Sequence, residues 1–237
     1  MNILVTNDDG IDAPGISLLA KAAAEFGTVT VLAPAVQSSG GAHSVHFHND
    51  FTLKKIKEGV WSMTGSPADC VRAAFNGLFD EKPDLVLSGI NDNFNTGCDI
   101  LYSATIGAAM EATLYGVPAV CLSEALEGDH SATRMFLRPV LGEIIHGHLE
   151  PGKVVNVNFP AVPAADCKGV KYGCFPANHP GYNDTYVRKP NADGSETVSI
   201  DAVRITAAEP GSDMDAIFNG YISVGVLQNG VALNRTN

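Results

Sequence analysis

The sequence predicts an α/β fold in three layers, a Rossmann-like, mostly parallel sheet between helices, followed by a β-rich carboxyl-terminal extension. Short apolar runs alternate with helical segments over residues 1–160, which is typical of βαβ units. The first run, residues 3–5, is too short for a helix and suits a strand buried on both faces. From residue 160 onward prolines punctuate the chain, and helical periodicity is lost until about Ser212.

Local signals place the individual elements. Ala13-Pro14-Gly15 opens the first helix, whose apolar residues recur at helical spacing as far as Phe26. Further helices are expected over residues 66–79, 103–115 and 129–147, the last with a kink at Pro139. Strands are expected at residues 28–33, 85–88, 119–123 and 153–158, at 45–53 and 60–63 as a hairpin, and at 198–205 and 221–226 in the extension.

The charge balance restricts the partners. The chain of 237 residues has 26 acidic and 15 basic residues, a net charge of −11. This argues against a nucleic-acid groove or an anionic membrane surface as the main partner. A small phosphorylated substrate stays compatible with the charge, because a bound metal ion changes the local field.

The sequence also indicates a compartment. No apolar run is long enough to span a membrane, and the amino terminus enters a strand without the features of a secretion signal. The five cysteines form no Cys-x-x-Cys pair and lie in or near apolar segments, which is typical of reduced thiols. We therefore expect a cytoplasmic protein.

The first strand ends in Asn7-Asp8-Asp9-Gly10, where two adjacent carboxylates repel each other. In open α/β sheets, ligands bind outside the carboxyl ends of the strands. A divalent cation shared by Asp8 and Asp9 is one interpretation, provided that Gly10 lets the chain turn there. A solvated turn is the other, since all four residue types favour turns.

Three loops follow predicted parallel strands and can converge at one edge of the sheet. They are the loop at Asp8 and Asp9, the Gln37-Ser38-Ser39-Gly40 loop, and the loop from Ser88-Gly89-Ile90-Asn91 to Gly97. The side chains that they offer are oxygen ligands, which suit Mg²⁺, Mn²⁺ or Ca²⁺ rather than Zn²⁺ or Cu²⁺.

Other common sites are not supported. The chain lacks the glycine pattern of a dinucleotide site after its first strand, a P-loop and a serine-hydrolase elbow. Asp8-Asp9 also lacks the Asp-x-Asp spacing of phosphatases with an aspartate nucleophile. His43, His46 and His48 have a spacing open to zinc, but we interpret them as residues of a polar strand edge. Asp69 is interpreted as a helix-start residue, and Cys70 and Cys121 as core thiols.

A set of segments spread along the chain forms one recognisable pattern: Ile3-Leu4-Val5-Thr6-Asn7-Asp8-Asp9-Gly10, Ala13-Pro14-Gly15-Ile16, Ala33-Pro34, Ser39-Gly40, Gly65-Ser66-Pro67-Ala68-Asp69-Cys70-Val71, Pro83-Asp84-Leu85-Val86-Leu87-Ser88-Gly89-Ile90-Asn91, Tyr102-Ser103, Gly181-Tyr182-Asn183-Asp184-Thr185-Tyr186 and Gly220-Tyr221-Ile222-Ser223-Val224. Together these segments resemble the survival protein SurE family, a family of metal-dependent phosphatases acting on nucleoside monophosphates. The resemblance covers nearly the whole chain.

The resemblance implies a function and a site. The family's metal ligands fall on Asp8, Asp9, Ser39 and Asn91, and the two aspartates would also be the catalytic pair. The expected reaction is hydrolysis of nucleoside 5′- and 3′-monophosphates, of the 5′-nucleotidase or acid-phosphatase type, with one divalent cation, Mg²⁺ or Mn²⁺, or Ca²⁺ as a structural occupant. Phosphate or substrate contacts are expected from the residues of the following loop and helix start: Asn95, Ser103 and Thr105.

The resemblance also implies an organisation. Residues 1–160 would form the core that binds metal and nucleotide, and residues 161–237 a β-rich appendage that completes the same domain and makes a homodimer or homotetramer. Two positions depart from the family pattern, because Asn93 and Ala104 stand where the family usually has glycine. They keep an alternative open, a nucleotide- or phosphate-binding regulator that retained the fold and lost turnover.

Overall fold

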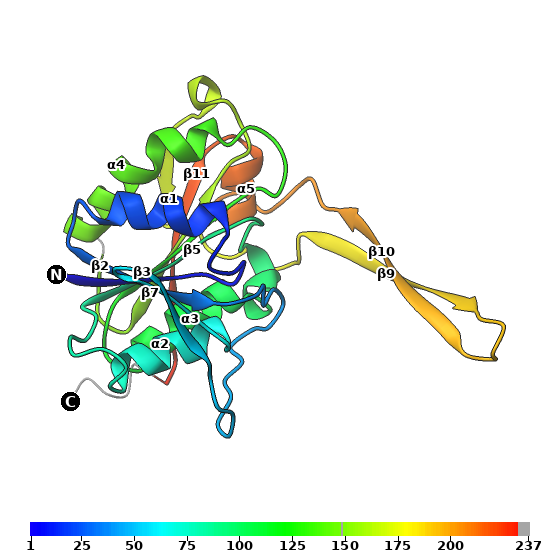
Figure 1. Cartoon of the computed structure of the whole chain (residues 1–237). Helices are drawn as coiled ribbons and strands as arrows, with labels where there is room; N and C mark the ends of the chain where they lie inside the picture. The colour runs from blue at the N-terminus through cyan, green and yellow to red at the C-terminus, as the bar shows by residue number, and fades with distance from the viewer. Residues whose placement is uncertain (148, 232–237) are drawn as a thin grey trace.

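The computed structural model describes residues 1–147 and 149–231 and shows a mixed sheet covered by helices on both faces (Figure 1). In the described residues the sheet has nine strands in the order β3-β4-β2-β1-β5-β6-β7-β11-β8. Their bounds are β1 (Asn2–Thr6), β2 (Thr28–Pro34), β3 (Leu53–Lys57), β4 (Val60–Met63), β5 (Leu85–Asn91), β6 (Ala119–Glu124), β7 (Lys153–Phe159), β8 (Val170–Tyr172) and β11 (Ile222–Gln228).

The six central strands, from β4 to β7, run parallel to one another. At the edges, β3 is antiparallel to β4, and β11 is antiparallel to β7. The predicted α/β fold with a mostly parallel sheet is thus confirmed. The parallel order also puts the carboxyl ends of β1, β2 and β5, which are neighbours, at one edge of the sheet.

Two helices cover each face of the sheet. The first face carries α1 (Pro14–Ala23) and α4 (Ser131–Gly147), and the second carries α2 (Pro67–Phe75) and α3 (Ala104–Thr113) (Figure 1). Shorter elements are the 3₁₀ turns η1 (Gly97–Leu101) and η2 (Ala164–Asp166) and the helix α5 (Asp213–Phe218). Among the described residues, none of the helices is long and apolar enough to cross a membrane.

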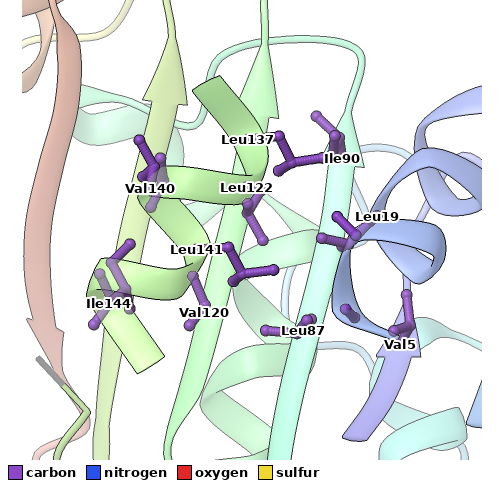
Figure 2. Close-up of a cluster of buried hydrophobic side chains, with 14 of the residues drawn as sticks. Val5, Leu19, Leu87, Ile90, Val120, Leu122, Leu137, Val140, Leu141 and Ile144 are labelled. Atoms are coloured by element: carbon purple, nitrogen blue, oxygen red, sulfur yellow. The ribbon is translucent and has the colours of Figure 1, made fainter. Parts of the chain in front are cut away.

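Figure 2 shows the core between the sheet and α4, where Leu137 and Leu141 lie one turn apart and face Leu122 of β6. Leu19 of α1 joins the same cluster from the neighbouring helix. All four side chains are buried. Truncating one such leucine to alanine typically costs about 2–5 kcal/mol, so this cluster fixes the sheet on which the loops are mounted.

The carboxyl-terminal region contributes to two sheets. Its strands β8 and β11 extend the main sheet beyond β7. Its strands β9 (Tyr182–Pro190) and β10 (Glu196–Arg204) form a separate antiparallel hairpin, which we call the arm and which projects away from the body (Figure 1). The expected strands at 198–205 and 221–226 are present, whereas β8 and β9 were not expected. Residues 232–237 of the predicted appendage lie outside the described residues.

Three predicted elements differ in detail. The strand expected at 45–53 was wrong, because the chain is irregular there and β3 begins only at Leu53. The hairpin of β3 with β4 is nevertheless present. Helix α2 ends at Phe75 and not near 79, since Asn76 caps it through a bond from Nδ2 to the Arg72 carbonyl and Gly77 follows with a φ of 100°. Helix α4 continues through Pro139 as one helix.

Candidate metal and phosphate site

The structure brings the three predicted loops to one cavity of about 400 Å³ at the carboxyl ends of β1, β2 and β5. Five of the predicted site residues line it: Asp8, Ser39, Asn91, Asn95 and Ser103. The other two, Asp9 and Thr105, do not line it, but each is hydrogen-bonded to a residue that does. Asp9 accepts a hydrogen bond at Oδ2 from the backbone N–H of Asp92, which lines the cavity, and Thr105 donates its hydroxyl to Asp8.

The turn after β1 is held in a shape that ideal strand geometry does not give. Asn7 donates from Nδ2 to the Gly10 carbonyl at 2.9 Å, and Gly10 has a φ of 96°, in the left-handed region that favours glycine. The backbone of Ser38 in the next loop donates to the Asp8 carbonyl at 2.7 Å. Gly10 therefore turns the chain directly after the two aspartates, which is the condition that the hypothesis of a shared ion sets.

The two carboxylates lie in an environment that disfavours their charge. Burial raises the pKa of Asp8 above its ordinary value, against the lowering effect of the hydrogen bond from Thr105 at 2.5 Å. Burial, followed by the charges of Asp8 and Asp92, raises the pKa of Asp9 to about 7. One oxygen of Asp9, Oδ1, is buried without a hydrogen-bond partner among the described residues. A cation between the two carboxylates would relieve these costs.

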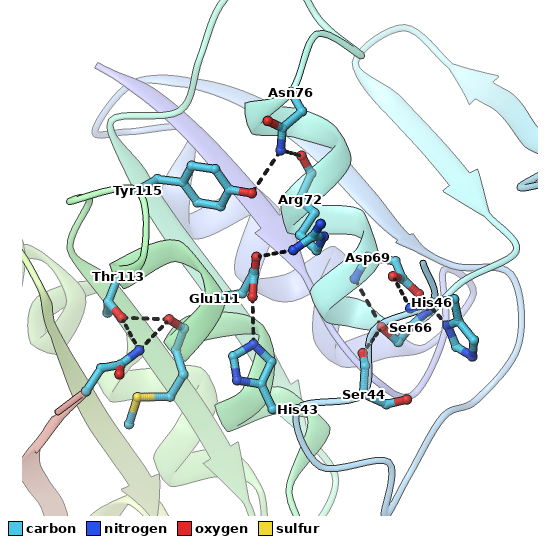
Figure 3. Close-up of polar contacts among 12 residues, drawn as sticks. His43, Ser44, His46, Ser66, Asp69, Arg72, Asn76, Glu111, Thr113 and Tyr115 are labelled. Carbon is cyan, nitrogen blue, oxygen red and sulfur yellow. Dashed lines mark hydrogen bonds and ion pairs between the residues drawn. The ribbon is translucent and has the colours of Figure 1, made fainter. Parts of the chain in front are cut away.

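Ser39 stands at the start of the long loop between β2 and β3, and this loop is tied to helices α2 and α3. His43 Nε2 lies 2.8 Å from Glu111 Oε2 in α3, and Glu111 is 3% exposed (Figure 3). The loop backbone also lies directly on α3 at Gly107, where an added Cβ would be 2.5 Å from the Ala42 carbonyl oxygen. Ala42 itself donates its N–H to the Tyr102 carbonyl.

A second tie joins the same loop to the start of α2. His46 donates from Nδ1 to Asp69 at 2.6 Å and from its backbone N–H to the same carboxylate at 3.0 Å (Figure 3). Ser66 caps α2 in a capping box with Asp69 and donates its hydroxyl to the Ser44 carbonyl. The helix-start role predicted for Asp69 is confirmed. The strand-edge interpretation of the histidines was wrong, because His43 and His46 lie in an irregular loop and bind two different carboxylates.

The amides of the third loop are oriented by hydrogen bonds. Asn91 donates from Nδ2 to the Asn93 carbonyl at 2.6 Å, which leaves its amide oxygen for a ligand. Asn95 is 3% exposed and donates from Nδ2 to the Ser123 hydroxyl at 2.6 Å. Its backbone N–H donates to the side chain of Asn158 at 2.9 Å. Asn95 is thus fixed on β6 and β7, next to the cavity.

Ser103 and Thr105 lie at the amino end of α3. Ser103 is the N-cap and accepts a hydrogen bond at Oγ from the Ile106 N–H at 3.1 Å. Its place in the cavity lining opens the first turn of α3 to a ligand, and helix amino ends attract anions. The hydroxyl of Thr105 donates a hydrogen bond to Asp8 Oδ1. Its predicted phosphate contact remains a prediction, beside this observed bond.

The two departures from the resemblance do not distort the loops. Asn93 lines the cavity and has no left-handed backbone, so a residue with a side chain fits there without strain. Ala104 is buried and lies next to Gly41 of the Ser39 loop. A Cβ added at Gly41 would still be 3.7 Å from the Ala104 methyl, which is an ordinary van der Waals contact. Neither residue therefore has a left-handed backbone conformation in which a side chain would be strained.

Sequence reasoning missed Asp92, Gln37 and Glu111. Asp92 lines the cavity beside Asn91, and its place in the same polar loop was the signal. Gln37 donates from Nε2 to Ser39 Oγ at 2.9 Å, and its place two residues before Ser39 was the signal. Glu111 had no such signal, because it meets His43 only through packing across 68 residues.

The charge of the cavity decides what it can bind. Its described lining includes Asp8, Asp92 and Asp99 but no lysine, arginine or histidine. A phosphate placed there would meet several carboxylates and no side-chain cation, so it needs a bound metal ion. The described residues contain no group of three His, Cys, Asp or Glu side chains arranged for a metal. An ion would therefore depend on Ser39 and Asn91 as well as on the two carboxylates, a donor set of oxygens alone that suits hard cations.

Comparison with known proteins gives the family. A sequence model described as Survival protein SurE matches residues 3–180. The protein named 5′-nucleotidase SurE from Geotalea uraniireducens (strain Rf4) is 35% identical over 236 residues, which cover 94% of this chain and 91% of that protein. A protein of the same name from Christiangramia forsetii is 37% identical over 237 residues, which cover 95% and 90%. The crystal structure of the SurE protein from Aquifex aeolicus matches with a TM-score of 0.84 and 32% identity, covering 96% of this chain and 93% of that one. This chain therefore belongs to the SurE family.

Proposed function

We propose that this protein is a metal-dependent phosphomonoesterase that hydrolyses nucleoside 5′- and 3′-monophosphates to nucleoside and phosphate. The observation that carries the proposal is the cavity itself, where Asp8, Ser39 and Asn91 converge without a basic side chain in the described lining. A hydrolase for an anionic ester with such a cavity needs a divalent cation. The relatives named 5′-nucleotidase SurE support nucleotides as the substrate class.

We assign the cation to Asp8, Asp9, Ser39 and Asn91. Oxygen donors of this kind fit Mg²⁺ or Mn²⁺, with Ca²⁺ as a structural occupant. The unpartnered, buried Oδ1 of Asp9 is the observation that favours this assignment. When bound, such an ion screens the phosphate charge and lowers the pKa of a water molecule for attack on phosphorus.

The remaining residues have positioning roles. Thr105 holds the Asp8 carboxylate in place through its 2.5 Å hydrogen bond. The amino end of α3, capped by Ser103, offers backbone N–H groups to the phosphate. Asn95, fixed by Ser123 and Asn158, forms part of the cavity wall on the side toward β6.

The test is release of inorganic phosphate from AMP and GMP with added Mn²⁺ or Mg²⁺, with EDTA as the metal-free control. We expect release with metal, none with EDTA, and none from the Asp9→Asn variant. Saturable nucleotide binding without phosphate release under all conditions would support the regulator instead. Neither binding nor release would contradict both functions.

We also propose a homodimer or homotetramer in the cytoplasm, with a small-molecule nucleotide as the substrate. The arm supports the assembly, because every residue of β9 and β10 is exposed in the single chain, including Tyr186, Val198 and Ile200. Exposed apolar side chains gathered on one projecting element favour an interface. The five free cysteines support the reducing compartment.

A further inference from the structure

The cavity at Asp8, Ser39 and Asn91, which we call the metal cavity, continues into a smaller recess at the base of the arm. This recess has a volume of about 210 Å³, and its lining shares Asn93, Phe94, Leu126 and Tyr182 with the metal cavity. A substrate whose phosphate lies at the aspartates can therefore extend past these side chains into the recess. Its remaining lining is Ala125, Glu127 and Arg204.

The arm places two of these residues and is itself tied to the site. Tyr182 and Arg204 are direct partners at the first and last position of the hairpin. The Gly181 N–H, next to Tyr182, donates to Asp99 Oδ2 at 2.8 Å, and Asp99 lines the metal cavity. The buried Asp213 at the start of α5 accepts from the Gly97 N–H at 2.9 Å, in the segment that follows Asn95. The base of the arm is thus fixed relative to the site loops.

Arg204 is the only basic side chain in the described linings of the metal cavity, the recess and a third small cavity beside them. Within the described part of the chain, it forms no ion pair or side-chain hydrogen bond, although Glu127 lines the same recess. Three other arginines, Arg72, Arg138 and Arg188, each lie in an ion pair with a glutamate. An unpaired guanidinium at the end of a substrate cavity indicates recognition of a group with hydrogen-bond acceptors.

From these features, and on the basis of the proposed nucleotidase function, we propose that the recess is a base subsite that selects guanine. Phe94 and Tyr182 supply the aromatic surface on which a base stacks. Arg204 presents paired N–H donors to N7 and O6, the two adjacent acceptors of guanine. Glu127 lines the recess too, and its carboxylate accepts hydrogen bonds from the N1–H and the 2-amino group of guanine.

Adenine fits the same residues less well. It offers Arg204 the N7 acceptor but places an amino donor where guanine has O6, so one guanidinium N–H loses its partner. Pyrimidines lack N7 and have a smaller face for stacking. A second phosphate in the recess is disfavoured, because Glu127 repels it and the aromatic walls give it no hydrogen bonds.

The experiment compares kcat/KM for GMP, AMP, CMP and the base-free glycerol phosphate, with Mn²⁺, in the wild type and in Arg204→Met and Tyr182→Ala. We expect the wild type to prefer GMP over AMP by about tenfold, as one bidentate pair provides. In Arg204→Met the ratio of GMP to AMP should fall close to one. In Tyr182→Ala the ratio of every nucleotide to glycerol phosphate should fall. Arg188→Met, on the same arm but paired with Glu196 away from the recess, is the matched control and should keep both ratios.

Calorimetric titration of GMP and AMP with Mn²⁺ reads the same preference without turnover. Equal affinities in the wild type, or an Arg204→Met variant that keeps the GMP preference, would overturn the guanine subsite. A loss in Arg204→Met seen for GDP but not for GMP would assign Arg204 to a second phosphate and also overturn it. Phosphate release from no substrate contradicts the nucleotidase function instead, and the titration still decides the subsite.

Discussion

His43 Nε2 and Glu111 Oε2 lie 2.8 Å apart and connect the Ser39 loop to the last turn of α3. Glu111 is buried, and its other oxygen lies 3.5 Å from Arg72 of α2 (Figure 3). The position of a predicted metal ligand therefore depends on a side-chain pair outside the cavity. This pair also gives His43 a role that does not require a metal.

Removal of this pair should weaken metal binding. Glu111→Ala leaves His43 and Arg72 without their shared partner, and we expect a loss of about 1–3 kcal/mol in the free energy of unfolding. We also expect a higher Mn²⁺ concentration for half-maximal phosphate release, because the Ser39 loop loses its tie to α3. His43→Gln, whose amide can still donate to Glu111, is the matched control and should retain most of the Mn²⁺ affinity. Unchanged Mn²⁺ dependence in Glu111→Ala would show that the tie is purely structural.

His46 and His48, the other two histidines of the cluster, should not act as zinc ligands. His46 donates to Asp69, and His48 is exposed. Replacing both with glutamine keeps a donor near Asp69, so metal-dependent phosphate release should stay within a few fold of the wild type. A loss as large as that of Asp9→Asn would show that the histidine cluster takes part in metal binding.

The alternation of strands and helices was enough to predict the sheet and the convergence of its loops. Asp8 and Ser39 follow parallel strands and Asn91 ends one, and parallel neighbours end at the same edge. The strand expected from residue 45 was wrong because the contacts of His43 and His46 are long-range and carry no local pattern. The recess at Arg204 was missed for the same reason, since the arm contributes to it only through tertiary placement.

The arm should mediate assembly. Ile200 pairs directly with Tyr186, and Val198 lies two residues away on the same face of the hairpin, so these side chains form an exposed apolar stripe. We expect a mass in light scattering of at least twice the 24.8 kDa of the chain at micromolar concentration. Ile200→Lys should shift the population toward monomer, whereas Ser199→Lys, on the opposite face, should do so less. A monomeric wild type would contradict the proposal.

Asp9 should make the metal-free protein sensitive to pH. Its pKa is raised to about 7 by burial and by the charges of Asp8 and Asp92, from an ordinary value of 3.8. The folded state then holds a proton that the unfolded state releases, so stability in EDTA should decrease as the pH rises from about 4 to about 7. Asp9→Asn cannot ionise and should lack this component of the decrease.

The same variant also tests the metal. Asp9→Asn should melt no lower than the wild type in EDTA at pH 8, and it should gain less from added Mn²⁺, because a ligand stabilises only as far as it binds the native state. Thermal melting of both proteins with EDTA and with Mn²⁺ makes the comparison. A mutant that melts lower in EDTA and gains as much from Mn²⁺ would identify Asp9 as a structural turn residue.

Thr105 should act through Asp8. Its buried hydroxyl donates to Asp8 Oδ1 at 2.5 Å, and this bond lowers the pKa of Asp8 against the raising effect of burial. Thr105→Val keeps the shape and removes the donor, so protonated Asp8 is favoured and Mn²⁺ competes with a proton for the site. We expect the Mn²⁺ requirement to rise about tenfold at pH 6 and less at pH 8, where the carboxylate ionises more fully. Thr113→Val, also buried on α3 but bonded to the Met110 carbonyl and to Asn229, is the matched control and should leave this requirement unchanged. An equal effect of Thr105→Val at both pH values, or an effect on KM for the nucleotide alone, would instead assign the hydroxyl to the phosphate.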